Sequence, residues 1–262
     1  MNVADLELGL LGDVGTLDWA QRGDGLLTNG ERRRFIAAAV TESVRSTPRL
    51  LALKFGKAGN KRASITAHDL LPPEAAPGAS IVAECRRLMT PSFVEHSYRS
   101  YVYAKALGRL AGISCDDLAL FAAAMFHDTG AFQLDSTGEG RCFTLNSARR
   151  LDELLAAAGW PDERRRISAE AVVMHLNPRV GEMRPEAHLL NAGVLLDVIG
   201  LRAWQFDAGS LETVQTRYPR RGFTDEARRL LTAQGKAVPR CRTAAAFRGG
   251  LGMGMRIGPW QD

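Results

Sequence analysis

The sequence predicts an all-α protein, a compact helical bundle with an irregular N-terminal arm in front of it. Apolar residues recur at helical spacing over most of the chain after residue 90, and no segment of useful length alternates apolar and polar residues as a β-strand would. The chain has 262 residues, of which 45% are hydrophobic and 24% are charged, so it can bury a sizeable core. This composition excludes a disordered chain, a fibrous repeat and a small disulfide-stapled domain.

The N-terminal part differs in character from the rest of the chain. Residues 1–27 are rich in Gly and Asp and lack a clear period, which predicts an irregular arm. Residues 28–31 (TNGE) have the spacing of a capping box, so a helix is expected to begin there and to end before Pro48. We therefore divide the chain into residues 1–75, an arm and helix of unknown role, and residues 76–262, the helical domain.

The helical domain is predicted from periodic segments separated by breakers. Residues 55–80 contain clustered Gly and Pro and are predicted to form a loop. Ser92 is expected to cap the next helix with Glu95, Ser114 to cap the one after it, and Pro185 suits a first helical turn. The predicted helices cover residues 92–112, 114–128, 146–158, 162–176, 185–200 and 224–234.

The net charge of +5 is unevenly distributed along the chain. Residues 1–31 contain six acidic residues and one arginine, whereas residues 217–262 contain ten basic residues and three acidic ones. A basic end could contact nucleic acid or an anionic substrate. Because no aromatic residues alternate with the basic ones, we expect a solvated or internally paired face, and no nucleic acid partner.

Cysteine spacing and hydropathy predict a cytoplasmic protein. The four cysteines lie far apart and form no Cys-x-x-Cys pair, which argues against a disulfide framework or a zinc finger. The longest uncharged apolar stretches, Leu118–Phe126 and Ala187–Leu196, have nine and ten residues, whereas a membrane span needs about twenty. The first residues are acidic and do not resemble a signal peptide. No membrane partner is expected.

Two carboxylates occupy positions that a plain core helix avoids. Residues 118–126 are apolar on every face of the predicted helix and lead directly into His127 and Asp128. Asp197 is likewise flanked by the apolar residues of 194–199. A carboxylate near the buried end of a helix is desolvated and faces the negative end of the helix dipole. One such residue is compatible with a hydrogen-bonded structural role, but two indicate a shared positive partner, of which a metal ion is the simplest.

The histidines support such a site unevenly. His96 shares one predicted helical face with apolar or aromatic residues seven, eleven and fourteen positions later, and His175 follows apolar residues by four and eight positions. Both are therefore predicted to point inward. His188 precedes Asp197 by nine residues and should point away from it, and His68 lies in the predicted loop and receives no role. For any single inward histidine, a hydrogen-bonded role in the core is the simpler interpretation. The prediction of a metal site therefore depends on the whole group of residues.

The order of these residues resembles a known family. His96, then His127 and Asp128 after 31 residues, then Asp197 on a later helix resemble the HD-domain superfamily of metal-dependent hydrolases. The stretches that resemble its cyanamide hydratase-like branch are HSYRSY at 96–101, FHDTG at 126–130 and YPRRGF at 218–223. The resemblance covers about residues 80–260. It implies an HD-type helical bundle around a metal site, with His96, His127, Asp128 and Asp197 as the metal ligands.

The resemblance also implies roles for the metal and for two further residues. One divalent transition metal is expected, zinc by resemblance, although iron and manganese also accept mixed His and carboxylate ligands. Such a metal lowers the pKa of water, and Asp128 would take part in catalysis as a ligand. His175 would donate a proton to the product or hold a second metal, and the lack of a carboxylate beside it favours a single metal. Arg99, three residues after His96, would bind the substrate, unless it is a surface arginine on the solvated side.

The function expected from these observations is a metal-dependent hydrolase or hydratase acting on a small polar molecule of the nitrile or C–N type. Two alternatives remain open. One is an HD-type phosphohydrolase acting on a nucleotide or another phosphate ester, and the other is a non-catalytic helical protein that binds nucleic acid or a partner. Neither a Gly-x-Ser-x-Gly elbow nor a phosphate-binding P-loop is present to suggest another chemistry. A homo-oligomer is compatible with all three.

Overall fold

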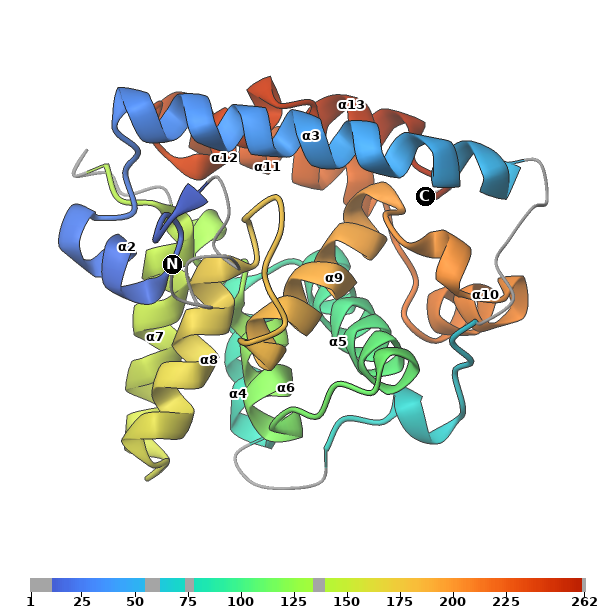
Figure 1. Ribbon diagram of the computed structural model, residues 1–262. Helices are drawn as coiled ribbons and strands as arrows, with labels where there is room; N and C mark the ends of the chain where they lie inside the picture. The colour runs from blue at the N-terminus through green and yellow to red at the C-terminus, as the bar shows by residue number, and fades with distance from the viewer. Residues whose placement is uncertain (1–10, 55–61, 74–77, 134–139, 261–262) are drawn as a thin grey trace.

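The computed structural model describes residues 11–54, 62–73, 78–133 and 140–260, and over these ranges the chain is all-α (Figure 1). Within them no β-structure extends beyond isolated bridges. The predicted fold class is therefore confirmed. The helices are α2 (Leu17–Gly23), α3 (Asn29–Lys54), α4 (Gly78–Leu88), α5 (Pro91–Ala111), α6 (Asp117–Phe126), α7 (Phe143–Ala157), α8 (Asp162–Met174), α9 (Pro185–Ile199), α10 (Ala208–Arg217), α11 (Phe223–Ala237), α12 (Arg242–Arg248) and α13 (Leu251–Ile257). Short 3-10 turns cover His68–Leu70, Thr129–Phe132 and Ala203–Gln205.

The helices lie in two groups, with α9 in contact with both. The long helix α3 runs along one side of the molecule beside α11, α12 and α13, and α4 to α8 lie on the other side (Figure 1). Helix α9 packs on α5, α6 and α8 in one group and on α13 in the other. Because α9 contacts both groups, its side chains can meet residues that are far apart in the sequence.

The closest approach between α5 and α9 depends on a glycine. A Cβ atom built on Gly193 would lie 2.2 Å from the carbonyl oxygen of Ser100, so no larger residue fits there without moving a helix backbone. His96 precedes Ser100 by one helical turn, and Asp197 follows Gly193 by one turn. The tight contact between α5 and α9 therefore brings His96 of one helix close to Asp197 of the other.

Helix α6 is the most deeply buried element of the bundle. Every residue from Ala119 to Phe126 is almost completely shielded from solvent, as the all-apolar sequence predicts. Asp116 caps the helix, because its carboxylate accepts hydrogen bonds from the backbone amides of Leu118 and Ala119. The sequence predicts Ser114 as the cap of this helix, but the capping residue lies two positions later. His127 and Asp128 follow the C-terminal end of this buried helix and therefore lie in the interior.

The described part of the N-terminal region belongs to the same core and is not a separate arm. Leu11, Val14, Trp19 and Phe35 belong to the apolar cluster that includes α5, α6 and α9. Helix α2 packs on α7 and α8, and α3 packs on α12. Only residues 1–10 of the predicted arm lie outside the described residues, so the prediction of an irregular arm is wrong for the segment that contains α2.

The boundaries of α3 and α5 also differ from the sequence-based expectation. Helix α3 continues through Pro48, which leaves one backbone carbonyl in the preceding turn without its helical donor. That turn is solvated (Val44 is 66% exposed), so water can satisfy the carbonyl. Helix α5 begins at Pro91 with Thr90 as its N-cap residue, and the Ser92 hydroxyl donates to Glu226 of α11 instead of capping its own helix.

Candidate metal centre

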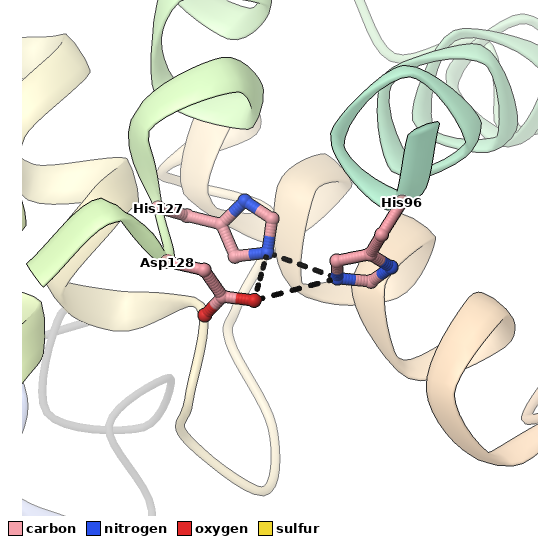
Figure 2. Close-up of side chains that lie close together, drawn as sticks. All are labelled: His96, His127 and Asp128. Atoms are coloured by element: carbon pink, nitrogen blue, oxygen red, sulfur yellow. Dashed lines mark hydrogen bonds and ion pairs between the residues drawn. The ribbon is translucent and has the colours of Figure 1, made fainter. Parts of the chain in front are cut away.

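Four predicted site residues converge from three helix ends. His96 lies in the second turn of α5, His127 is the C-cap residue of α6, Asp128 follows it, and His175 is the C-cap residue of α8. The three imidazole side chains are at most 2% exposed, and that of Asp128 is 9% exposed. Figure 2 shows His96, His127 and Asp128 pointing toward one another. The structure therefore brings together residues that are up to 79 positions apart.

The ligand-type atoms of three residues form a small triangle. The Nε2 atoms of His96 and His127 lie 3.1 Å apart, and the Oδ2 atom of Asp128 lies 3.3 Å from Nε2 of His127 and 3.7 Å from Nε2 of His96 (Figure 2). In a tetrahedral zinc site with bonds of about 2.0–2.1 Å, two ligand atoms are about 3.3 Å apart. The three separations match this spacing, so the group fits one transition metal ion.

The hydrogen bonds at the opposite ring nitrogens determine the tautomers. Nδ1 of His127 lies 2.7 Å from the carbonyl oxygen of Ala124, and Nδ1 of His96 lies 2.6 Å from Asp197. Both partners can only accept, so each Nδ1 carries the hydrogen and each neutral ring directs an Nε2 lone pair at the other ring. Two lone pairs at 3.1 Å repel unless a proton or a metal ion lies between them. Histidine ligands of metals usually have this second hydrogen bond, which holds the ring in orientation.

His175 has the same arrangement at the edge of the group. Its Nδ1 atom lies 2.6 Å from the carbonyl oxygen of Val172, so its Nε2 atom also carries a lone pair. Nε2 lies 3.8 Å from Oδ1 of Asp128, which is the carboxylate oxygen that does not face His96 and His127. His175 therefore contacts the site from the other side of the carboxylate.

Asp197 does not belong to the triangle, in contrast to the ligand set implied by the resemblance. It lies on the far side of His96, with Oδ2 at Nδ1 of that ring. Both carboxylate oxygens also accept from Arg99, at 2.8 and 2.9 Å, and Oδ1 accepts from Arg220 at 3.0 Å. The positive partner expected for Asp197 is thus a pair of arginines, and its contact with the site is through His96.

Arg99 is a buried partner of Asp197 and does not lie on the solvated side of its helix. Its side chain is fully buried, and two of its remaining donors bond the carbonyl oxygens of Tyr218 and Pro219. Four of its five N–H groups are occupied in this way inside the core, so the substrate-binding assignment is not supported. Arg220 is a site residue that sequence reasoning missed, although it lies within the YPRRGF stretch.

The two carboxylates are both held ionised, but by different partners. Burial alone would raise the pKa of Asp197, yet Arg99 and Arg220 outweigh it and hold that pKa far below its ordinary value. Burial would also raise the pKa of Asp128, and there His127 is the main opposing group. Burial lowers the pKa of His175 to about 3, so this ring is neutral near pH 7. Burial would lower the pKa of His127, but the adjacent Asp128 carboxylate outweighs it and raises that pKa above its ordinary value.

The other histidines lie where the sequence placed them. Nδ1 of His188 bonds the carbonyl oxygen of Val180, and His188 is not part of the metal-ligating group found among the described residues. His68 begins a short 3-10 turn and makes no contact with the site.

An apolar pocket of about 130 Å³ opens onto the site. Asp128 and His175 form part of its wall, and most other wall residues are apolar side chains of α3, α9, α11 and the C-terminal helices. Phe223 connects the pocket to the histidines, because its ring stacks on His96 with the centroids 4.3 Å apart. The pocket is thus a route by which a small molecule can reach Asp128.

Neither the models of known protein families nor the curated protein sequences contain a match to this chain. Among the described residues, no helix has the length and hydropathy of a bilayer-spanning segment.

Proposed function

We propose that this chain is a metal-dependent hydrolase or hydratase that holds one divalent transition metal, by preference zinc, between His96, His127 and Asp128. The observation that carries the proposal is the triangle of two Nε2 atoms and one carboxylate oxygen, with separations of 3.1, 3.3 and 3.7 Å. The resemblance of these residues to the HD-domain superfamily supports it. Three protein ligands leave a coordination position open, which is typical of catalytic metal sites.

The residues of the site have separable roles in this proposal. His96 and His127 would bind the metal through Nε2, with Asp197 and the Ala124 carbonyl holding the two rings in place. Asp128 would bind through Oδ2, which leaves Oδ1 on the side of His175. When bound, the metal would lower the pKa of water toward neutrality and polarise the group under attack.

The proposed reaction is the addition of water to a carbon–nitrogen multiple bond. For a nitrile, the water oxygen forms a bond to carbon, one carbon–nitrogen π bond breaks, and nitrogen takes up a proton; the resulting imidic acid tautomerises to the amide. The lone pair of His175 Nε2 can accept a hydrogen bond from the water and guide the proton that water loses to nitrogen, a role that a ring kept neutral by burial can fill. The chain then ends the cycle in its starting protonation state.

Metal analysis tests this proposal directly. We expect the purified protein to contain about one equivalent of a transition metal and the Asp128→Asn variant to lose it. Asp162→Asn is the matched control, because the Asp162 side chain is 96% exposed and lies in another part of the fold. Metal content that is the same in all three proteins would contradict the ligand assignment. Absence of hydrolytic or hydratase turnover in the metal-loaded protein, over a panel of nitriles, amides and phosphate esters, would contradict the enzymatic proposal.

A further inference from the structure

The pocket beside Asp128 is lined mainly by apolar side chains. Phe93, Phe143 and Phe223 line it together with Asp128 and His175, and the ring centroids of Phe143 and His175 lie 6.0 Å apart. Val194, Val198 and Leu231 add further apolar wall. A molecule in this pocket would place one end against Asp128 and the rest of its surface against hydrocarbon.

The size of the pocket limits the size of the apolar group. Its volume of about 130 Å³ is close to the roughly 150 Å³ of an engineered apolar protein cavity that stays dry and binds benzene. A single six-membered ring or a short branched alkyl chain fills such a space. A nucleoside, which adds a sugar to a base, is larger than this, so part of it would lie outside the apolar walls.

The charges around the pocket disfavour an anion. Among the described residues that line it, none is Lys or Arg, and the ionisable ones are Glu42, Asp128 and His175. Glu42 is half-buried and is already paired with Arg45 at 3.1 Å and with Arg179 at 3.9 Å. Phosphate groups are usually bound by arginine, lysine or helix N-termini. Apart from the metal proposed at Asp128, the wall supplies no arginine or lysine to compensate the charge of a phosphate in an apolar pocket.

We propose that the substrate is a neutral molecule with a polar reacting group at Asp128 and His175 and an apolar body about as large as a benzene ring. This inference rests on the proposed function, since it assigns the pocket to the substrate of the metal site. It narrows the substrate class to apolar nitriles or related C–N compounds, and it excludes both nucleotides and very small polar nitriles as preferred substrates.

Three probes separate the properties that the pocket should recognise. Benzonitrile and phenyl phosphate share the ring and differ in charge, whereas benzonitrile and cyanamide share the nitrile and differ in the apolar body. We would titrate each probe by calorimetry and ligand-detected NMR into the zinc-loaded protein and into chelator-treated protein. Benzonitrile is expected to bind at least tenfold more tightly than the other two probes to the zinc-loaded protein, and to remain bound when the metal is removed.

Pocket-filling variants locate the binding. Val198→Phe fills the pocket from α9 and should weaken benzonitrile binding at least tenfold. Val44→Phe is the matched control, because Val44 is 66% exposed and does not line the pocket; its affinity should stay within twofold of wild type. If circular dichroism shows that Val198→Phe is unfolded, Ala246→Leu fills the pocket from α12 and replaces it.

The outcomes distinguish this inference from the function on which it rests. Equal or tighter binding of cyanamide or phenyl phosphate, absent binding of benzonitrile, or unchanged affinity in a folded pocket-filling variant would overturn the inference. Turnover of cyanamide by zinc-loaded protein that does not bind benzonitrile would support the proposed function and contradict the inference about the substrate class. The protein could also bind benzonitrile in a way that depends on Val198 but retain no metal and show no turnover. That result would support the ligand class inferred for the pocket and contradict the proposed function.

Discussion

Replacing Asp197 by Asn should destabilise the protein strongly while removing metal only indirectly. The Asp197 side chain is fully buried, and it neutralises two buried guanidinium groups, those of Arg99 and Arg220, with donor–acceptor distances of 2.8 to 3.0 Å. An asparagine keeps the shape but has no charge, so two positive charges remain in the interior without compensation. Breaking a buried ion pair in this way costs about 3–5 kcal/mol.

The expected size of the effect makes it easy to measure. For a domain of 150–250 residues, 1 kcal/mol corresponds to about 2–4 °C in Tm, so a chain of this length should lose roughly 6–20 °C. Metal affinity should fall about 10–100-fold, the usual effect of removing a group that orients a histidine ligand. Thermal unfolding of chelator-treated protein isolates the stability effect, and competition with a zinc indicator measures the affinity.

Asp128→Asn provides the contrast, because no arginine side chain contacts Asp128 in the described structure and its carboxylate faces three imidazoles. This variant should lose measurable metal binding while the metal-free protein keeps most of its Tm. The reasoning is refuted if metal-free Asp197→Asn unfolds at the wild-type temperature, or if it loses metal as completely as Asp128→Asn does. The second result would show that Asp197 is itself a ligand, as the family resemblance implies.

Three further changes test other parts of the structure. His175→Ala should lower turnover about 100-fold with little change in metal content, because a lost proton-transfer group costs about that much; parallel loss of metal would show that His175 is a ligand. Gly193→Ala should cost about 3 kcal/mol or more, since the added Cβ would meet the Ser100 carbonyl oxygen at 2.2 Å, and chemical denaturation measures this. Burial alone would raise the pKa of Asp69, but Arg109, 2.5 Å away, helps to lower it to about 2. The stability from this pair should therefore be lost as the pH falls from about 4 to about 2, and Asp69→Asn should lose that dependence in acid unfolding.

Local patterns predicted the interior of the fold better than its edges. The apolar run of α6 and the glycine or proline at helix ends act within a few residues, so the central helices could be located from sequence, although the cap of α6 is Asp116 and not Ser114. Helices α12 and α13, with seven residues each, are too short to show a period and depend on packing against α11 and α9. The role of Gly193 also could not be predicted from sequence, because the atom that leaves no room for a side chain belongs to Ser100 on another helix.

In the site, too, features set by neighbouring residues could be predicted from sequence, whereas features set by residues distant in the chain could not. His127 and Asp128 could be recognised as unusual because an apolar helix ends at them, and the inward direction of His96 and His175 followed from helical spacing. Which atom of each ring faces the site could not be inferred, since it depends on carbonyl oxygens and a carboxylate that only the fold brings close. Arg220 was missed for the same reason, because nothing in its neighbourhood indicates a partner on α9.

The two buried carboxylates illustrate why a shared cation was too simple an inference. From sequence, Asp128 and Asp197 look equivalent, since each ends an apolar segment and each lacks a local positive partner. The fold supplies Asp197 with guanidinium groups from 98 residues before it and 23 residues after it, whereas Asp128 receives only imidazoles. Imidazoles with Nδ1 committed as donors offer lone pairs, which compensate a carboxylate only when a proton or a metal ion is bound between them. The residue that still needs a positive charge is therefore Asp128, and the metal proposal depends on that residue and the two histidines that face it.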